Sequence, residues 1–385
     1  MVYVTVKQPP VYHQMTLEEF LFEESPKIHY ARGDSTTTRT YAQETLSERV
    51  RRFADVDKLI LSLMDFNRKT EKLRSRPRKQ LYYEFYIPKK SGGLRKIDAP
   101  NEDLKAALRD LKKIFEKEFG ALYHTSAFAY IEGRSTIAAM ERHRENESKW
   151  FAKYDLSNFF GSTTKEFVLR QLSMIFPFCE VMKSSTGKRE LETAIDLCTL
   201  DNVLPQGTPI SPMLTNLVMI PIDYTIAKAL REFPTGDGHA QRFIYTRYAD
   251  DFQISSRYDF KFREIEAFIR KTMEELGAPY VMKPEKTRYG SSSGSNWNLG
   301  LMLNANNEIT VGHKKKRQLQ AMIASYIMDS QKGVEWDLHD VQVMDGLIHY
   351  YSNVEGTEKI DAIVNHVGGK FGVNVKDMIH RDLTK

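Results

Sequence analysis

The segment Tyr248-Ala249-Asp250-Asp251 constrains the fold of this chain more than any other part of its sequence. It lies between two short runs of apolar and β-branched residues within 242–255. Such runs on both sides of a short polar segment predict a hairpin of two strands with the carboxylates at its tip. A solvated turn explains most isolated aspartate pairs. Between two strands, however, the adjacent anions repel each other, and a divalent cation offsets that repulsion well.

A third acidic residue, Asp155, follows a short apolar strand predicted at Trp150–Tyr154. Two aromatic residues, Phe159 and Phe160, come soon after it. An aspartate in this place suits a functional site at the end of a strand. On its own, it equally suits the N-cap of a helix that starts there.

The segment Leu204–Pro212 contains three prolines and Gly207, and it leads into a predicted helix. Proline restricts the backbone, and glycine lets a ligand approach the main chain closely. Because proline is also favourable at the start of a helix, an ordinary helix-entry loop explains the segment equally well.

These three segments together favour phosphoryl transfer. The two-metal route needs carboxylates from different strands that converge on two ions roughly 3.5–4 Å apart. Asp155 and Asp250 would supply that convergence. One ion would activate a primer 3′-hydroxyl, and the other would hold the triphosphate and stabilise the leaving pyrophosphate.

The rest of the chain is predicted to be mainly helical, with one basic hairpin. Its strands are predicted at Leu81–Pro88 and Leu94–Ile97, joined by a turn that contains Gly92 and Gly93. Apolar spacing and capping predict helices that start at Thr16 and that span Ser47–Leu63, Leu104–Phe119, Asn216–Arg231, Phe260–Leu276 and most of the chain from Ile309 onward.

Composition narrows the class of protein further. The chain has 385 residues, of which 41% are hydrophobic, enough for two or three packed subdomains. Its two cysteines exclude a disulfide framework and a four-thiolate zinc site. We see no signal peptide and no apolar stretch of membrane-spanning length, and therefore expect a cytoplasmic protein. The net charge is +5, and basic residues concentrate at 68–96 and 314–317, which favours a polyanionic partner.

The three motifs resemble those of the reverse transcriptase family, and specifically its bacterial branch of retron and group II intron enzymes, which includes phage-defence reverse transcriptases. The matching segments run from about Tyr86 to Gly300. The resemblance implies an α+β right-hand polymerase with fingers, a palm built on an antiparallel sheet, and a helical thumb. The implied boundaries are an N-terminal extension at 1–50, fingers and palm at 51–300, and the thumb at 301–385. That last segment has no room for a ribonuclease H domain as well.

The resemblance also implies roles for individual residues. Asp155, Asp250, Asp251 and the backbone carbonyl of Leu156 would bind two Mg²⁺ ions, for which Mn²⁺ could substitute. Phe160 would lie under the incoming sugar, where its bulk would clash with a 2′-hydroxyl and so select deoxynucleotides. The other residues implied to contact the nucleotide are Lys89, Lys90, Arg95, Gln206, Gly207 and Lys286.

Primer and template contacts are implied for the hairpin tip, a primer grip and a basic thumb helix. These residues are Tyr248, Trp297, Leu299, Gly300, Lys314, Lys315, Lys316 and Arg317. Each of these assignments has a structural alternative. Phe160 could be a core aromatic, the basic fingers hairpin could be a solvated turn, and Lys286 could be a surface lysine.

The resulting hypothesis is an RNA-directed DNA polymerase that copies a dedicated structured non-coding RNA into DNA in anti-phage defence. Its partners would be that RNA as template and primer, the RNA–DNA hybrid product, deoxynucleoside triphosphates and a separate effector protein. Template-independent or protein-primed DNA synthesis is one alternative. RNA-templated RNA synthesis and a non-catalytic RNA-binding scaffold are two others.

Overall fold

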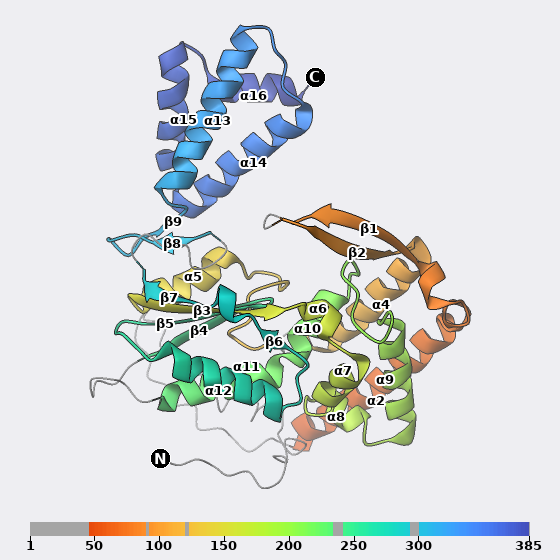
Figure 1. Ribbon diagram of the computed structural model, residues 1–385. Helices are drawn as coiled ribbons and strands as arrows, with labels where there is room; N and C mark the ends of the chain where they lie inside the picture. The colour runs from red at the N-terminus through yellow and green to blue at the C-terminus, as the bar shows by residue number, and fades with distance from the viewer. Residues whose placement is uncertain (1–45, 90–91, 120–122, 234–241, 293–299, 385) are drawn as a thin grey trace.

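A computed structural model describes residues 46–89, 92–119, 123–233, 242–292 and 300–384 (Figure 1). The helix predicted from Thr16 and nearly all of the predicted N-terminal extension lie outside these residues. So do Lys90, Trp297 and Leu299 of the predicted site.

A five-stranded antiparallel sheet lies at the centre of the molecule (Figure 1). Its strands are β3 (Trp150–Ser157), β4 (Ile244–Tyr248), β5 (Asp251–Ser256), β6 (Val281–Met282) and β7 (Arg288–Ser291). The order is β4-β5-β3-β6, and β7 also pairs with β3. The predicted hairpin is thus confirmed as β4 and β5.

The side chains of β3 alternate between two hydrophobic cores. Ala152, Tyr154 and Leu156 belong to the larger core, whereas Phe151 belongs to the core of the C-terminal helices. Because alternate residues of a strand point to opposite faces, Lys153 and Asp155 lie on the Phe151 face. β3 continues three residues beyond the predicted Tyr154, so Asp155 lies within the strand.

Helices α11 (Ile220–Glu232) and α12 (Phe262–Glu275) lie along one side of the sheet (Figure 1). The single helix predicted at Asn216–Arg231 is wrong. The structure has α10 (Ser211–Val218) and then α11, with Pro221 in the first turn of the second helix. Proline has no backbone N–H with which to continue the hydrogen bonds of α10, but it is well tolerated where a new helix begins.

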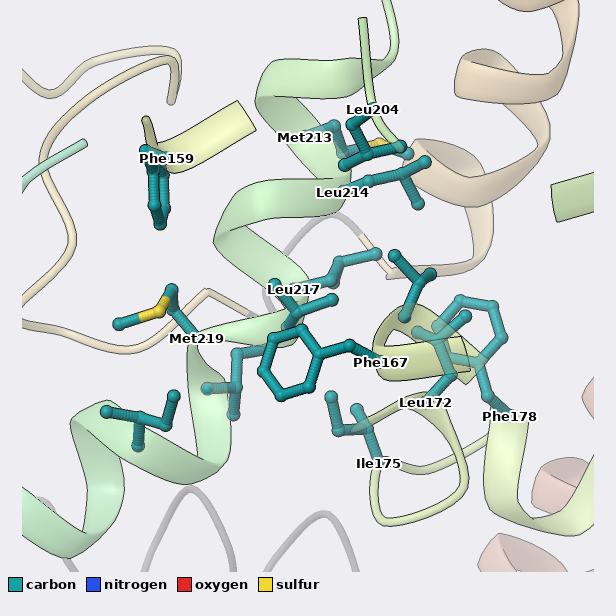
Figure 2. Packing of buried hydrophobic residues seen from close by; sticks show 14 of the residues in the cluster. Phe159, Phe167, Leu172, Ile175, Phe178, Leu204, Met213, Leu214, Leu217 and Met219 are labelled. Carbon is teal, nitrogen blue, oxygen red and sulfur yellow. The ribbon is translucent and has the colours of Figure 1, made fainter. Parts of the chain in front are cut away.

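The larger core continues into the part of the chain before β4. There, Phe167 of α7 (Lys165–Leu172) and Phe178 of α8 (Phe178–Val181) lie in the same core as Leu214 of α10 (Figure 2). The predicted hairpin is confirmed as β1 and β2, and the predicted helices at Ser47–Leu63 and Leu104–Phe119 as α2 and α4. The elements of this part are α2 (Leu46–Lys69), α3 (Glu71–Arg74), η2 (Arg78–Leu81), β1 (Tyr82–Pro88), β2 (Leu94–Pro100), α4 (Glu102–Phe119), α6 (Phe159–Ser162), α7 (Lys165–Leu172), α8 (Phe178–Val181) and α9 (Ser185–Leu197). By contrast, α5 (Thr136–Glu145) packs against β4 and contributes Met140 to the core of the C-terminal helices, and η3 (Pro284–Lys286) packs against β3.

The C-terminal helices form their own core above the sheet (Figure 1). They are α13 (His313–Gln331), α14 (Leu338–Glu355), α15 (Thr357–Phe371) and α16 (Val375–Leu383), and a small hairpin of β8 (Met302–Leu303) and β9 (Ile309–Thr310) precedes them. The predicted helical character of this part is confirmed. These helices correspond to the predicted thumb, and the exact domain boundaries stay predictions.

Both Cys179 and Cys198 are free and buried. In the described part of the chain, no helix is long and apolar enough to cross a membrane.

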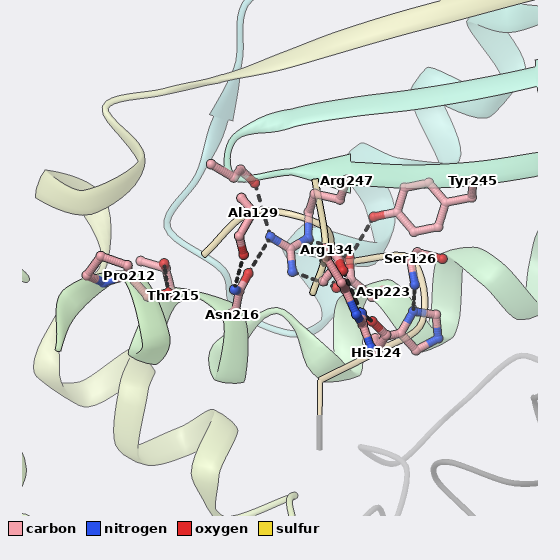
Figure 3. Close-up of polar contacts among 12 residues, drawn as sticks. His124, Ser126, Ala129, Arg134, Pro212, Thr215, Asn216, Asp223, Tyr245 and Arg247 are labelled. Atoms are coloured by element: carbon pink, nitrogen blue, oxygen red, sulfur yellow. Dashed lines mark hydrogen bonds and ion pairs between the residues drawn. The ribbon is translucent and has the colours of Figure 1, made fainter. Parts of the chain in front are cut away.

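A fully buried ion pair joins the helical side of the sheet to the hairpin (Figure 3). Arg247 in β4 and Asp223 in α11 are both 0% exposed, and Nη2 of Arg247 lies 2.8 Å from Oδ2 of Asp223. The remaining groups are satisfied as well, because Nη1 of Arg247 donates to Oδ1 of Asn216 and to the carbonyl of Ala249. Tyr245 donates its hydroxyl to Asp223. A buried pair with all of its hydrogen bonds made favours a single arrangement of these elements.

We expect Arg247→Leu to lower the free energy of unfolding by about 3–5 kcal/mol, because it leaves the Asp223 carboxylate buried without its cation. Tyr245→Phe is the matched control. It removes one hydrogen bond to the same carboxylate and should cost about 1.5 kcal/mol. Chemical denaturation measures both. A loss for Arg247→Leu no larger than that of the control would contradict a structural role for the pair.

Candidate active site

Three aspartates meet at one end of the central sheet. Asp155 in β3 pairs with Asp251 in β5 in the strand register. The backbone N–H of Leu156 donates to the carbonyl of Asp250 at 3.1 Å. Ala249 has a positive φ of 56°, which turns the chain tightly between β4 and β5. The backbone therefore brings the three aspartate residues to the same end of the sheet.

Lysine side chains neutralise two of these carboxylates. Nζ of Lys153 lies 2.7 Å from Oδ2 of Asp251. Nζ of Lys283 and Nζ of Lys286 lie 3.2 and 3.1 Å from Oδ2 of Asp155. Lys286 thus contacts Asp155, one of the predicted metal ligands, and its predicted contact with the nucleotide stays a prediction.

The electrostatics of the site favour a cation. Burial raises the pKa of Asp250, and the neighbouring Asp251 and Asp155 raise it further. Burial also raises the pKa of Asp251, although Lys153 opposes that shift. Ionised carboxylates that are destabilised by burial and by each other gain most from a bound divalent ion.

The donor set fits a hard metal ion, because carboxylate and carbonyl oxygens are the ligands that Mg²⁺ prefers. However, among the residues that the structure describes, no three His, Cys, Asp or Glu side chains are arranged to hold a metal ion. In the described residues, the carboxylates of Asp251 and Asp155 instead pair with the ammonium groups of Lys153, Lys283 and Lys286. The backbone places the three aspartates next to one another, as the predicted metal site requires. Their side chains, however, do not point to a common metal position.

The predicted sugar-contacting residue, Phe160, lies in the short helix α6 directly after β3 and is half-buried. A tyrosine that the sequence reading missed, Tyr130, lies next to it. Their ring centroids are 6.3 Å apart in an edge-to-face arrangement. Burial raises the pKa of Tyr130, and the charge of Asp250 and the neighbouring Tyr248 raise it further.

The loop with Gln206 and Gly207 contacts the fingers hairpin. The carbonyl of Gln206 accepts a hydrogen bond of 2.8 Å from the N–H of Asp98 in β2. Gly207 has a φ of 120°, and a Cβ there would lie 2.9 Å from Cγ2 of Ile97 and 3.0 Å from the carbonyl of Asp98. No residue other than glycine fits this close approach without displacing the backbone of the hairpin.

Lys89 and Arg95, the two described residues of the hairpin that are predicted to contact the nucleotide phosphates, are exposed. The charge of Arg95 partly opposes the rise in the pKa of Tyr130 that burial causes. The guanidinium of Arg95 is exposed to solvent. Such a position suits a contact with the phosphates of a nucleotide.

The basic helix of the thumb divides into inward and outward residues. Lys315 donates to the carbonyl of Gly300 at 2.9 Å, and Lys316 pairs with the buried Glu355 at 2.8 Å. Both side chains therefore have structural partners. Lys314 and Arg317 are exposed, and their contact with nucleic acid stays a prediction.

Lys153, Lys283 and Tyr130 are the site residues that sequence reading missed. Lys153 carried a signal, because residues two apart in a strand share a face, and a lysine two positions before Asp155 is the sole charged residue of the predicted strand. Tyr130 and Lys283 reach the site from distant segments, and no local pattern marks them.

Carboxylates on neighbouring strands of an antiparallel sheet, between a finger-like hairpin and a helical thumb, define the class of right-hand nucleic-acid polymerases. The family described as reverse transcriptase (RNA-dependent DNA polymerase) matches residues 87–323, more than half of the chain. The chain belongs to this family, and it is an RNA-directed DNA polymerase. Members of the family generally use divalent metal ions such as Mg²⁺.

The chain is similar to two retron enzymes of Escherichia coli. It is 26% identical to the retron Ec83 reverse transcriptase over 310 residues, which cover 78% of this chain and 89% of that one. It is 26% identical to the retron Ec73 reverse transcriptase over 275 residues, or 70% and 82% of the two chains. Among solved structures, telomerase from Candida tropicalis covers 79% of this chain and 69% of its own, with 11% identity and a TM-score of 0.41.

We expect Gly207→Ala to weaken nucleotide binding. The added methyl group would push β2 away from the loop, and the backbone conformation at this position is unfavourable for alanine. The KM for deoxynucleotide should rise by about tenfold, and kcat should change less, because the carboxylates lie elsewhere. Steady-state primer extension measures this, with Gly333→Ala in the thumb as the control, since it has a positive φ but an open surrounding.

We expect Asp250→Asn to stabilise the metal-free protein at neutral pH. Folding raises the pKa of Asp250, so the ionised carboxylate costs stability once the pH exceeds its ordinary value of 3.8. The asparagine variant should melt roughly 2 °C higher at pH 7, and the difference should shrink as the pH falls toward 4. Thermal melts in a chelator test this, with the exposed Asp110→Asn as the control. A variant that melts lower than wild type at pH 7 would contradict it.

Proposed function

We propose that this enzyme is a retron-type reverse transcriptase that copies a dedicated structured RNA into DNA by two-metal nucleotidyl transfer. One observation carries the mechanism. The register of β3 with β5 pairs Asp155 with Asp251, and the turn places Asp250 beside them. The similarity to enzymes named for retrons supports the nature of the template.

The aspartates and Lys286 would have different roles in the reaction. When bound, Mg²⁺ ions would activate the primer hydroxyl and neutralise the phosphates, held by Asp155, Asp250, Asp251 and the carbonyl of Leu156. Lys286 would move from Asp155 toward the leaving pyrophosphate, since its side chain is half exposed.

The fingers hairpin would hold the triphosphate. Arg95 presents a planar donor pair that suits a bidentate phosphate contact, and Lys89 adds a point charge. Gln206 and Gly207 support this hairpin through Asp98 and Ile97. The nucleotide would thus lie between the hairpin and the carboxylates.

Phe160 would select the sugar. It lies in α6, directly after the strand that carries Asp155, and its ring packs against Tyr130. A 2′-hydroxyl of the incoming nucleotide would meet this ring. The product would therefore be DNA. On the thumb, Lys314 and Arg317 would contact the backbone of the RNA–DNA duplex, while Tyr248 and the segment around Gly300 would support the primer end.

The decisive test is primer extension by purified protein on the RNA that copurifies with it, in the presence of Mg²⁺. We expect a DNA copy of that RNA, and a loss of at least about 10³-fold in Asp250→Asn, because the variant lacks one carboxylate of the metal site. Asp110→Asn should remain active. Sequencing separates the alternatives, since a product unrelated to any RNA indicates template-independent synthesis. Equal activity in wild type and Asp250→Asn would reject the proposal.

The proposal extends to anti-phage defence with a separate effector protein, on the basis of the resemblance to bacterial retron and defence enzymes. A host that carries the complete locus should resist phages that lyse the same host with Asp250→Asn in place of wild type. Equal plating efficiency across a broad phage panel would leave the polymerase intact and remove the role in defence.

A further inference from the structure

The backbone of Tyr130 has an uncommon conformation at the edge of the active site. Its φ is 62°, in the left-handed region that bulky residues rarely occupy. Its side chain is 50% exposed, so burial in the core does not explain the conformation. A bulky residue keeps such a backbone only where the surrounding structure imposes it, and such residues concentrate at functional sites.

The loop that carries Tyr130 is held from several directions. The side chain of Asn216 donates to the carbonyl of Ala129 at 2.7 Å, and the N–H of Phe128 donates to the carbonyl of Arg247 at 2.8 Å. Arg134 donates to the carbonyls of His124 and Ala127, which closes the loop on itself (Figure 3). The position of Tyr130 is therefore fixed by the same buried network that holds the aspartate turn.

Tyr130 ends a chain of four aromatic rings. Tyr280 and Phe159 are buried, with ring centroids 5.1 Å apart. Phe159 contacts Phe160 at 5.8 Å, and Phe160 contacts Tyr130 at 6.3 Å, both edge to face. Phe160 thus lies between a ring that the core fixes and the ring of Tyr130. Without Tyr130, one side of Phe160 would be open to rotation.

We propose that Tyr130 is a positioning residue that fixes the ring of Phe160 and thereby sets how strongly the enzyme rejects ribonucleotides. The inference rests on the proposed role of Phe160 in sugar selection. A ring that excludes a single hydroxyl group must be held within a fraction of an ångström, because a small rotation opens the space that the hydroxyl needs. Tyr130 supplies that restraint on the side of Phe160 that the core does not reach.

The test uses variants that keep the left-handed backbone. Asparagine and glycine both tolerate a positive φ, so Tyr130→Asn and Tyr130→Gly remove the ring without adding strain. Tyr130→Phe keeps the ring and removes only the hydroxyl. Tyr258→Ala is the matched control, because Tyr258 is similarly exposed, at 46%, and follows the opposite end of β5.

The quantity to measure is the ratio of kcat/KM for a deoxynucleotide to kcat/KM for the matching ribonucleotide, in primer extension by the full chain. A general loss of activity cancels in this ratio, and so does a modest loss of folded protein. We expect Tyr130→Asn and Tyr130→Gly to lower the ratio by about threefold to tenfold, on the scale of one lost edge-to-face aromatic contact. Tyr130→Phe and Tyr258→Ala should keep it.

Phe160→Ala separates the two hypotheses. If it lowers the ratio and both ring-removing variants of Tyr130 leave it unchanged, the inference about Tyr130 is wrong and the sugar selection by Phe160 stands. If Phe160→Ala also leaves the ratio unchanged, the assignment of Phe160 fails and the inference falls with it. A decrease in Tyr130→Phe as large as in Tyr130→Asn would overturn it as well, because the hydroxyl and not the ring would then matter.

Discussion

The buried pair of Arg247 and Asp223 is the interaction on which the active end of the molecule depends. Burying either charge alone would strongly destabilise the fold, so the two side chains are buried as a pair. Their pairing fixes β4 against α11. The same guanidinium also donates to the carbonyl of Ala249, in the turn that carries the aspartates. Through Asn216 it is linked to the loop of Tyr130. One side chain therefore sets the register of a strand, the shape of a turn and the place of a loop.

The carboxylates at the end of the sheet lower the stability of the fold, and the reaction requires them. Burial and mutual repulsion raise the pKa of both Asp250 and Asp251. Lys153, Lys283 and Lys286 offset part of this cost through ion pairs. An enzyme selected for stability alone would replace the carboxylates, whereas one that must assemble cations around a triphosphate has to keep them. The lysines make the arrangement tolerable without a metal ion.

Local patterns predicted much of this structure. The hairpin of β4 and β5, the fingers hairpin and the long helices follow from apolar spacing and turn residues, which act within a few positions of the chain. The helix predicted at Asn216–Arg231 failed where Pro221 outweighed a continuous apolar pattern. What no local pattern revealed is long-range pairing: Arg247 with Asp223, Lys283 with Asp155, and Tyr130 with Phe160. The same limit applies to the thumb, where two residues of a basic run turned out to have structural partners.

The alternation of β3 explains how the core and the chemistry share a single strand. Ala152 and Tyr154 face the helices beneath the sheet, and Phe151 packs into the core of the thumb. Lys153 and Asp155 lie on the same face of β3 as Phe151. Because Phe151 packs into the core of the thumb, the carboxylate of Asp155 lies on the side of the sheet that faces the thumb. A shift of one residue in the pairing with β5 would exchange the faces and bury Asp155 in an apolar core. The hydrophobic pattern that folds the palm thus also decides on which side the reaction takes place.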